Sequence, residues 1–395
     1  NATQVGFALG PRINASGRMQ HADLAVKLLI SQDDAEALAY AEQLDQLNKE
    51  RQRIVQQMTE EAVEQWSSSG REQTDRIILL KDEHWHEGVI GIVASKLLEK
   101  YYCPAIVFSV NEETGLAKGS ARSIPGFSMY EALQSCSHLL EQFGGHDAAA
   151  GLTVKVDNLP LLQQHLNTIA NEVLKKEDLI PITNADMECR LDDIHMDTVE
   201  QLEQLAPYGQ ANPPPLFVVR GLQVAEKIPL GKEGKHLKLI VRDPASKQAE
   251  PKEALLFGNG LFTHLISSAA PIDLLVELGI NEWNGRRTPQ LFVRDLRIGN
   301  VQVLDWRKRN GWENYNKVLT YLQSFSPSSW SPLLLTAAEL DAVNLPEPLQ
   351  SSPVRTYQEL ELLQIESEDA SWPVTDLFLL APPPSLDVWQ SIISK

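Results

Sequence analysis

The chain has 395 residues, of which 43% are hydrophobic and 22% are charged, and its formal net charge is −18 at pH 7. This length predicts two to four domains, because single hydrophobic cores stop growing near roughly 250 to 300 residues. The excess of acidic residues excludes nucleic-acid binding over the whole surface, since it repels a polyanion, so any such binding must be local.

Cysteine usage and hydropathy indicate a cytoplasmic protein. Cys103, Cys136 and Cys189 lie far apart in the sequence, which predicts neither a disulfide framework nor a structural zinc site. No apolar run approaches the roughly 18 residues that span a bilayer, and no segment has the pattern of a signal peptide. We therefore expect a cytoplasmic location and no membrane partner.

The chain begins with Asn1 and reaches a motif rich in Gly and Arg almost at once, PRINASGR at residues 11–18. A natural amino terminus is usually mobile and carries few motif residues. We therefore expect a fragment that lacks upstream sequence, in which residues 1–32 form the end of a preceding domain and residues 11–18 form a phosphate-binding loop.

Residues 33–66 contain neither Gly nor Pro, and their apolar residues recur mostly at every third or fourth position. This pattern predicts one long helix. At 1.5 Å per residue the helix would reach about 50 Å. The sequence SSSG at residues 67–70 ends it. We expect residues 33–70 to connect two domains rather than to take part in catalysis.

Residues 71–180 alternate between strand and helix patterns. We predict strands at residues 77–80, 105–110, 118–123 and 152–156, and helices at residues 88–100, 129–142 and 159–175. Such alternation predicts an α/β domain, with a sheet covered by helices.

Residues 181–300 have a different pattern, dominated by strands. A proline-rich connector at residues 207–215 precedes five strand-like runs, a number that suits a small β-barrel: residues 216–224, 236–241, 253–257, 272–280 and 290–298. Residues 220–300 hold 12 Lys and Arg against 9 Asp and Glu, which makes them a basic island in an acidic chain.

Cations and aromatic residues in this island favour single-strand binding, which combines the two. In the second run polar and mostly basic residues alternate with apolar ones, although a solvated outer face would show the same alternation. The candidate DNA-binding residues are Lys235, Lys238, Trp283, Arg286 and Arg287. For residues 301–395 we predict a small extra α/β module, with a strand at 377–380 and a helix at 386–393.

Three short motifs set small, flexible residues beside cations or hydroxyls: residues 11–18, GSARS at 119–123 and GGH at 144–146. This combination lets backbone N–H groups approach a phosphate while side chains neutralise it. Together the motifs predict a phosphate-handling site.

Each motif alone also has a purely structural interpretation. Gly144 and Gly145 could end a helix, and Arg122 could form a surface ion pair of little value. Arg12 could equally tie the long helix to its neighbour, and Ser123 could start the turn that follows it.

A family resemblance rests on these motifs together with HEGVIGIVAS at residues 86–95 and AAAG at residues 148–151. They resemble the DHH/DHHA1 phosphoesterases. Within that superfamily, PYG at 207–209 with NP at 212–213, and NEWNG at 281–285, resemble the RecJ family of single-strand-specific 5′-to-3′ DNA exonucleases. The matches span residues 5–300.

The resemblance implies a fold and a domain order. The fold class is α/β plus β-barrel. Residues 1–32 would end a DHH domain, residues 33–70 would form the connector helix, residues 71–180 a DHHA1 α/β domain, and residues 181–300 an OB-fold-like barrel. Residues 301–395 would follow as a carboxy-terminal extension.

The resemblance also implies a two-metal mechanism with Mn²⁺ or Mg²⁺ bound by the DHH domain. The Asp-His-His motif of that domain is absent from this chain. His84 and His86 do not replace it, because a lone His-x-His is more often a hydrogen-bonding pair in a loop than a metal site. We therefore expect no metal ligands here, and no hydrolysis of DNA by this chain alone.

Residue roles follow from the same resemblance. His146, presented by Gly144 and Gly145, would be catalytic and approach the scissile phosphate. The residues that would bind the terminal phosphate or line the cleft are Ser120, Arg122, Ser123, Arg12, Asn14, Arg18 and His86. The implied activity serves DNA repair and recombination, with single-stranded DNA as substrate and a helicase or single-strand-binding protein as a partner.

Two other functions stay open. One is a DHH phosphodiesterase for short oligonucleotides or cyclic dinucleotides, which would not need a barrel that tracks a strand. The other is a non-catalytic single-strand-binding module that keeps the scaffold. Degradation of long single strands compared with dinucleotides separates the first from an exonuclease.

Overall fold

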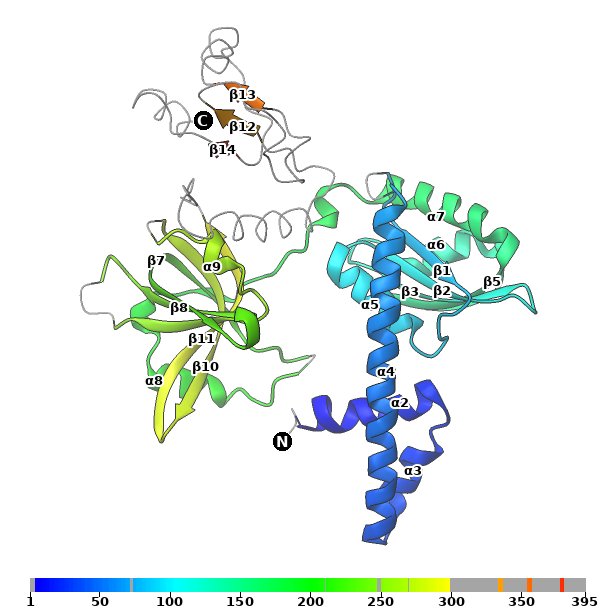
Figure 1. Ribbon diagram of the computed structural model, residues 1–395, viewed down its shortest axis with the longest axis horizontal. Coiled ribbons are helices and arrows are strands. Elements are labelled where there is room, and N and C mark those ends of the chain that lie inside the picture. Colours follow the sequence, from blue (N-terminus) through cyan, green and yellow to red (C-terminus); the bar gives the residue numbers. More distant parts are fainter. Residues whose placement is uncertain are drawn as a thin grey trace. The chain divides into compact units, whose positions relative to one another are not determined.

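The computed structural model describes residues 4–298 except 72–73, 210, 247–249 and 269, together with residues 333–336, 354–356 and 377–379. The chain divides into two compact units, Asn1–Ile182 and Thr183–Lys395, and each is described by itself (Figure 1). No helix among the described residues is long and apolar enough to cross a lipid bilayer. The helix predicted at residues 386–393 lies outside the described part.

The first unit begins with short helical segments that pack on a long helix. The π-helical η1 (Val5–Leu9) continues into α2 (Gly10–Met19), and α3 (Asp23–Ile30) follows. Residues 11–18 are therefore helical rather than a loop, and Pro11 fits because the first turn of a helix needs no N–H donor. Figure 1 shows α2 and α3 beside the amino-terminal half of the long helix α4.

The long helix predicted from the sequence is confirmed as α4 (Asp34–Ser68), a continuous helix of 35 residues. Asp33 caps its start, because the carboxylate accepts a hydrogen bond from the N–H of Glu36 at 2.9 Å. Trp66, Ala62 and Met58 are buried against the sheet of this unit. α4 thus has one end in the core of the α/β domain and the other beside α2 and α3.

The sheet of the first unit has the strand order β1-β2-β3-β5-β4. β1 pairs with β2 in parallel and the other pairs are antiparallel. The strands are β1 (Ile78–Asp82), β2 (Ala105–Asn111), β3 (Leu116–Arg122), β4 (Leu140–His146) and β5 (Ala149–Lys155). The helices are α5 (Ile90–Tyr101), α6 (Met129–Ser135) and α7 (Leu159–Val173).

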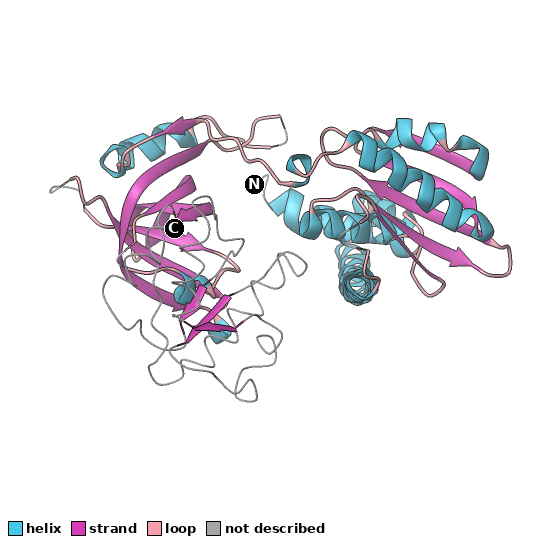
Figure 2. Ribbon diagram, turned by 90° about the horizontal axis from the view of Figure 1, so that it is seen from above, coloured by secondary structure: helices cyan, strands magenta, loops and turns pink. Residues whose placement is uncertain are grey.

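Helices cover the two faces of this sheet unequally (Figure 2). α6 and α7 pack on one face, where Phe108 and Leu152 are buried with Leu162. α4 and α5 pack on the other face over β1, β2 and β3, where Leu80 and Val107 are buried. Beyond α5 this second face is open, so the ends of β3, β5 and β4 are exposed there. The α/β domain predicted from the sequence is confirmed.

The helix predicted at residues 129–142 is wrong in its last part. α6 ends at Ser135, and β4 starts at Leu140 after a single 3₁₀ turn. Residues 140–146 pair with β5, with Phe143 opposite Leu152, and this tertiary pairing overrides the local helical pattern. Gly144 and Gly145 consequently lie within a strand, not at the end of a helix.

The second unit contains a closed β-barrel. β7-β8-β9 form an antiparallel meander, β9 pairs with β11 in parallel, and β10 pairs with both β11 and β7. The bounds are β7 (Leu216–Leu230), β8 (His236–Arg242), β9 (Lys252–Leu256), β10 (Ile272–Trp283) and β11 (Arg286–Ile298). Because β10 returns to β7, the sheet has closed into a barrel, as the sequence predicted.

Alternation builds the barrel core. Leu237, Leu239 and Val241 of β8 point inward and are fully buried, while the residues between them face out. β7, β10 and β11 extend beyond their predicted ends and carry register shifts, which let long strands bend around a small barrel. β6 (Met187–Glu188), α8 (Met196–Glu203) and α9 (Phe262–Leu265) complete the barrel domain.

Farther along the chain, β12 (Leu333–Thr336) pairs in parallel with both β13 (Val354–Thr356) and β14 (Leu377–Leu379). β14 coincides with the strand predicted at residues 377–380. The domain assignment of residues 301–395 stays a prediction.

Close packing in the first sheet generates a test at Gly119 of β3. A Cβ at this position would lie 2.5 Å from Cε1 of Phe108 and 2.8 Å from Cδ2 of Leu152, both in the core. We expect Gly119→Ala to lower the free energy of unfolding by about 1–3 kcal/mol, the usual cost of overpacking. Gly151→Ala on β5 is the matched control, because nothing lies within 4 Å of its Cβ position. Equal denaturant midpoints for the two variants would contradict this packing.

Candidate functional site

Ser120 and Arg122 lie on the open face of the first sheet, beside the first turn of α5. Nη1 of Arg122 donates to Oγ of Ser120 at 3.2 Å and to the carbonyl of Ala121 at 2.8 Å. Gly91 is so close that a Cβ there would lie 2.8 Å from Oγ of Ser120 and 3.0 Å from Nη2 of Arg122. The hydroxyl and the guanidinium therefore point together at the start of a helix.

His146 shares this face with Arg122. Both residues pair with Ala149, which lies on the strand between them. Directly paired residues project from the same side of a sheet, and two strand spacings place the Cα atoms of His146 and Arg122 about 10 Å apart. The His146 side chain is exposed and makes no hydrogen bond with another described residue. The row presents a cation and an imidazole to the same side.

The two glycines before His146 have different roles. Gly145 has a φ of 148°, and a Cβ there would lie 2.4 Å from the carbonyl oxygen of Ala149 and 2.5 Å from Cα of Ala150. A larger residue would therefore disturb the pairing that holds His146 in place. Gly144 has no atom within 4 Å of its Cβ position, so it leaves the surface beside the histidine uncovered.

The two arginines of α2, Arg12 and Arg18, lie on different sides of the helix. Asn14 and Arg18 are four residues apart and share one face, whereas Arg12 lies on another. Arg18 donates to the carbonyl of Gly88, just before α5, at 3.2 Å. It also lowers the pKa of Arg122, for which burial is the larger cause and the like charge of Arg18 the smaller one. Arg18 therefore reaches the neighbourhood of Arg122.

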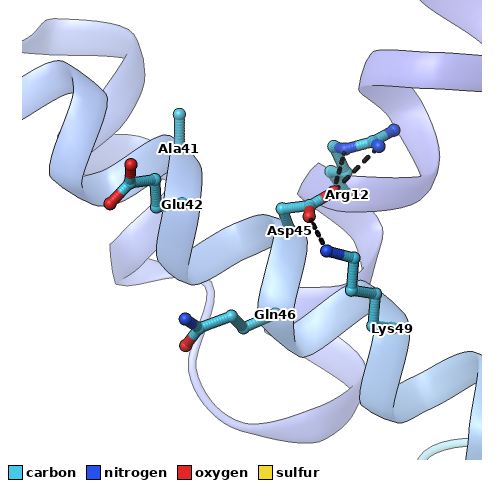
Figure 3. Close-up of a pocket in the computed structure, with 6 residues that line it drawn as sticks. All are labelled: Arg12, Ala41, Glu42, Asp45, Gln46 and Lys49. Carbon is cyan, nitrogen blue, oxygen red and sulfur yellow. Dashed lines mark hydrogen bonds and ion pairs between the residues drawn. The ribbon is translucent and has the colours of Figure 1, made fainter.

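Arg12 instead connects α2 to α4. Its Nε and Nη2 contact Oδ1 of Asp45 at 2.9 and 2.8 Å, and its Nη1 donates to the carbonyl of Ala8 at 2.7 Å. Lys49 binds the other oxygen of Asp45 at 2.8 Å, and the pKa of Asp45 is lowered by Lys49 first and then by Arg12. Figure 3 shows both cations directed at this one carboxylate.

The hollow around Arg12 does not favour an anion. It has a volume of about 620 Å³ and is lined by Arg12, Ala41, Glu42, Asp45, Gln46 and Lys49. Both of its cations are already paired with Asp45, and Glu42 adds a second carboxylate.

Ser123 and His86 make local contacts of their own. The Ser123 hydroxyl donates to the carbonyl of Phe127 at 2.7 Å, which closes the turn that follows β3. Nδ1 of His86 accepts from the N–H of Gly88 at 3.1 Å. His86 also borders a hollow of about 450 Å³ that contains the carboxylates of Glu61 and Asp82. Neither residue is brought to the row of Arg122 and His146 by these contacts.

Arg51 is a neighbour of this site that the sequence analysis missed. It lies on α4, in phase with the buried residues Leu44, Val55 and Met58, which follow a spacing of three or four. Its Nε is buried without a hydrogen-bond partner. Burial and, to a smaller extent, the charge of Arg18 lower its pKa. The signal available in the sequence was a charged residue on the buried side of a long amphipathic helix.

The β10–β11 hairpin separates the predicted DNA-binding residues of the barrel. Asn284 and Gly285 have positive φ angles of 50° and 75° and form its tight turn. Trp283 is 73% exposed and pairs with Arg286 on the outer face of the barrel. Arg287 points to the other side, where it binds Glu200 of α8 at 2.5 Å. Of the three hairpin residues, Trp283 and Arg286 therefore extend the open outer face and Arg287 does not.

An aromatic row lies on the same outer face. Phe257 contacts His236 edge to face at 5.4 Å and stacks on Phe292 at 6.3 Å between ring centroids. Phe257 is 60% exposed. Phe257 was missed as a candidate because nothing in its local sequence distinguishes it from a core residue at the end of a strand. Lys238 is on this face too and pairs with Glu253 at 3.0 Å, whereas Lys235 is exposed in the β7–β8 loop.

Comparison with known proteins identifies both domains. Residues 74–172 match the DHHA1 domain family, and residues 185–295 match the RecJ OB domain family. A protein of Bacillus subtilis (strain 168), named single-stranded-DNA-specific exonuclease RecJ, is 37% identical over 390 residues, which cover 98% of this chain and 47% of that protein. The chain belongs to the RecJ family.

Other RecJ proteins agree in sequence and fold. The protein of the same name from Escherichia coli (strain K12) is 31% identical over 301 residues, covering 75% of this chain and 51% of that protein. The chain thus spans about half the length of the curated relatives it matches. The crystal structure of RecJ from Thermus thermophilus in complex with Mg²⁺ has a TM-score of 0.62 and 23% identity, covering 100% of this chain and 60% of that one, and it supports the fold.

The RecJ domain matches fall inside the predicted DHHA1 and OB segments, residues 71–180 and 181–300. The predicted domain boundaries themselves stay predictions. Among the described residues, no group of three or more His, Cys, Asp and Glu side chains is arranged to hold a metal ion.

The two arginines of α2 generate a test of their different roles. Arg12→Ala removes the connection between α2 and α4, so we expect it to lower the melting temperature of the chain. Asp45→Asn should have the same effect, because it breaks the same contact. Arg18→Ala should lower the melting temperature less, since it loses one hydrogen bond but relieves repulsion with Arg51 and Arg122. A larger loss for Arg18→Ala than for Arg12→Ala in thermal unfolding would refute this assignment.

Proposed function

We propose that this chain is the substrate-positioning part of a single-strand-specific 5′-to-3′ DNA exonuclease that acts in DNA repair and recombination. The names of the RecJ relatives support the activity. The observation that carries the proposal is the placement of Arg122 and His146 in one register row of an open sheet face. A strand end lying along this row would contact both side chains.

In this proposal Arg122 and Ser120 bind the terminal phosphate. The guanidinium is planar and always charged, and it can donate two parallel hydrogen bonds to phosphate oxygens. Its partly buried position strengthens such bonds, because less water competes for them. Arg18 and Asn14 approach from α2, and His146 stands one strand beyond Ala149, at the phosphodiester to be cleaved.

We propose Mg²⁺ or Mn²⁺ as the cofactor of the whole protein, since solved Thermus thermophilus RecJ structures contain these ions. Two such ions would activate water and stabilise the leaving oxygen. The described residues do not fit these ions, because they offer no suitable ligand group. Their own contribution is to bind and orient the phosphate.

The outer face of the barrel would guide the strand in this proposal. Phe292 lies six positions after Arg286 on β11, a distance of about 20 Å at the rise of a strand, which suits the several nucleotides that an OB fold holds. Stacking on Trp283, Phe257 and Phe292 does not depend on base sequence. We place the enzyme in the cytoplasm, with a helicase or single-strand-binding protein as a partner that supplies the strand.

Neighbouring arginines of the hairpin test the barrel surface. We expect Arg286→Gln to weaken the binding of a single-stranded oligonucleotide by the 395-residue chain and to reduce its salt dependence by about one phosphate contact. Arg287→Gln is the matched control and should lower thermal stability instead, because it breaks the pair with Glu200. Fluorescence anisotropy at several salt concentrations measures both. Binding that is insensitive to salt, or equal losses for the two variants, would argue against the proposal.

The sheet face is tested in the complete enzyme that contains this chain. His146→Ala and Arg122→Gln should each reduce turnover on long single strands by about 100-fold or more, with little change in melting temperature. Lys155→Gln is the control, since it removes a cation paired with Glu141 at the far end of the same sheet.

Digestion of long strands compared with dinucleotides completes this test. Faster cleavage of dinucleotides would favour the small-substrate phosphodiesterase. Loss of folding in step with loss of turnover would reduce His146 and Arg122 to structural residues.

A further inference from the structure

Three arginines of the first unit, Arg18, Arg51 and Arg122, have no carboxylate paired with them in the described part of the chain to balance their charge. Among the described residues, none of the three forms an ion pair with a carboxylate. Arg18 binds the carbonyl of Gly88, and Arg122 binds Ser120 and the carbonyl of Ala121. The guanidinium of Arg51 makes no hydrogen bond within the described chain, and its Nε is buried.

Two polar neighbours of Arg51 on α4, Arg53 and Asn48, have contrasting environments. Arg53, two residues later, is exposed and holds both carboxylate oxygens of Glu50 at 2.7 and 3.0 Å. Asn48, one turn before Arg51, is 4% exposed and its Oδ1 is also without a partner. The buried stripe of α4 therefore carries unpaired polar atoms at the level where α2 crosses it.

This arrangement costs free energy in the absence of a ligand. An arginine does not lose its proton in a protein, so burial and mutual repulsion cannot be relieved by deprotonation. Both causes act here, because burial and the charge of Arg18 lower the pKa of Arg51 and of Arg122. Arg51 and Arg122 are partly buried, and a charge that loses part of its hydration without gaining a partner of opposite sign destabilises the fold. Arg18 is the like charge that acts on both of the other arginines, so an anion bound beside Arg18 would offset the repulsion and accept the unused N–H groups.

We propose that Arg51 is a further phosphate-binding residue, which completes with Arg18 and Arg122 a site for the monoester phosphate at the end of a nucleic-acid strand. The identity of the strand rests on the proposed function. The preference for a terminal phosphate follows from charge, since a monoester carries about −1.5 to −2 at pH 7 and a backbone diester carries −1. The three cations match the higher charge.

The first test uses inorganic phosphate and the 395-residue chain. Thermal unfolding is followed while phosphate replaces chloride at constant ionic strength, for the wild type, Arg51→Gln and the control Arg53→Gln. We expect phosphate to raise the melting temperature of the wild type and of Arg53→Gln equally, because binding to the folded state stabilises it. Arg51→Gln should lose most of this rise, and Arg51→Lys should keep part of it.

Without phosphate, Arg51→Gln should be at least as stable as Arg53→Gln, since it removes repulsion rather than an ion pair. A structural role would give the opposite result, a loss of stability with an unchanged response to phosphate. That outcome overturns the proposal, and so does a wild type whose melting temperature does not respond to phosphate.

The second test separates the sources of the phosphate. Anisotropy compares the binding of one oligonucleotide with a 5′-phosphate, a 3′-phosphate or no terminal phosphate. We expect Arg51→Gln to weaken binding of a phosphorylated end by about tenfold, the size of one charge-assisted hydrogen bond, and to leave the unphosphorylated strand unchanged. An equal loss for all three strands would assign Arg51 to a backbone phosphate and overturn the terminal site. These measurements need no cleavage, so they stand or fall separately from the exonuclease activity.

Discussion

Backbone contact at the start of α5 determines where the arginines lie. A Cβ on Gly88 would lie 1.9 Å from the carbonyl oxygen of Arg18, and a Cβ on Gly91 would lie 2.8 Å from Oγ of Ser120 and 3.0 Å from Nη2 of Arg122. The first turn of α5 is thus held between α2 and β3 with no side chain between them. Any larger residue at Gly88 or Gly91 would move one group of cations away from the other, because the contacts are with the backbone of Arg18 on one side and with the side chains of Ser120 and Arg122 on the other.

α4 makes this arrangement rigid over a long distance. Its carboxy-terminal half buries Met58 and Trp66 in the α/β core, and its amino-terminal half holds α2 through Asp45. The same helix therefore fixes Arg18 relative to Arg122, although the two residues are far apart in the sequence. Under the proposal for Arg51, the helix would do more than connect two domains, since Arg51 lies on its buried side.

The sequence predicted those features that depend on local pattern. The uninterrupted helix α4 and the alternation of Leu237, Leu239 and Val241 in β8 needed no knowledge of distant partners. β4 was missed because its pairing with β5 is decided by Phe143 meeting Leu152, not by residues 140–146 themselves.

The sequence could not distinguish the role of Arg12 from that of Arg18. Arg12 and Arg18 belong to one motif and look alike in the sequence. Only the helical phase of α2 assigns Arg12 to Asp45 and Arg18 to the neighbourhood of Arg122. In the barrel, the contact of Phe257 with Phe292 joins parts of the chain that are not consecutive in the sequence. The local sequence around either residue therefore could not predict it.

The strand that carries His146, β4, lies at the edge of its sheet. Among the described strands, β4 pairs with β5 alone. Local opening of β4 therefore breaks hydrogen bonds on one side only, whereas β3 is paired on both sides. We expect amide protons of β4 to exchange with solvent sooner than those of β3. His146 thus lies on the edge strand, which should open more readily, while Arg122 lies on a central strand, which should open less readily.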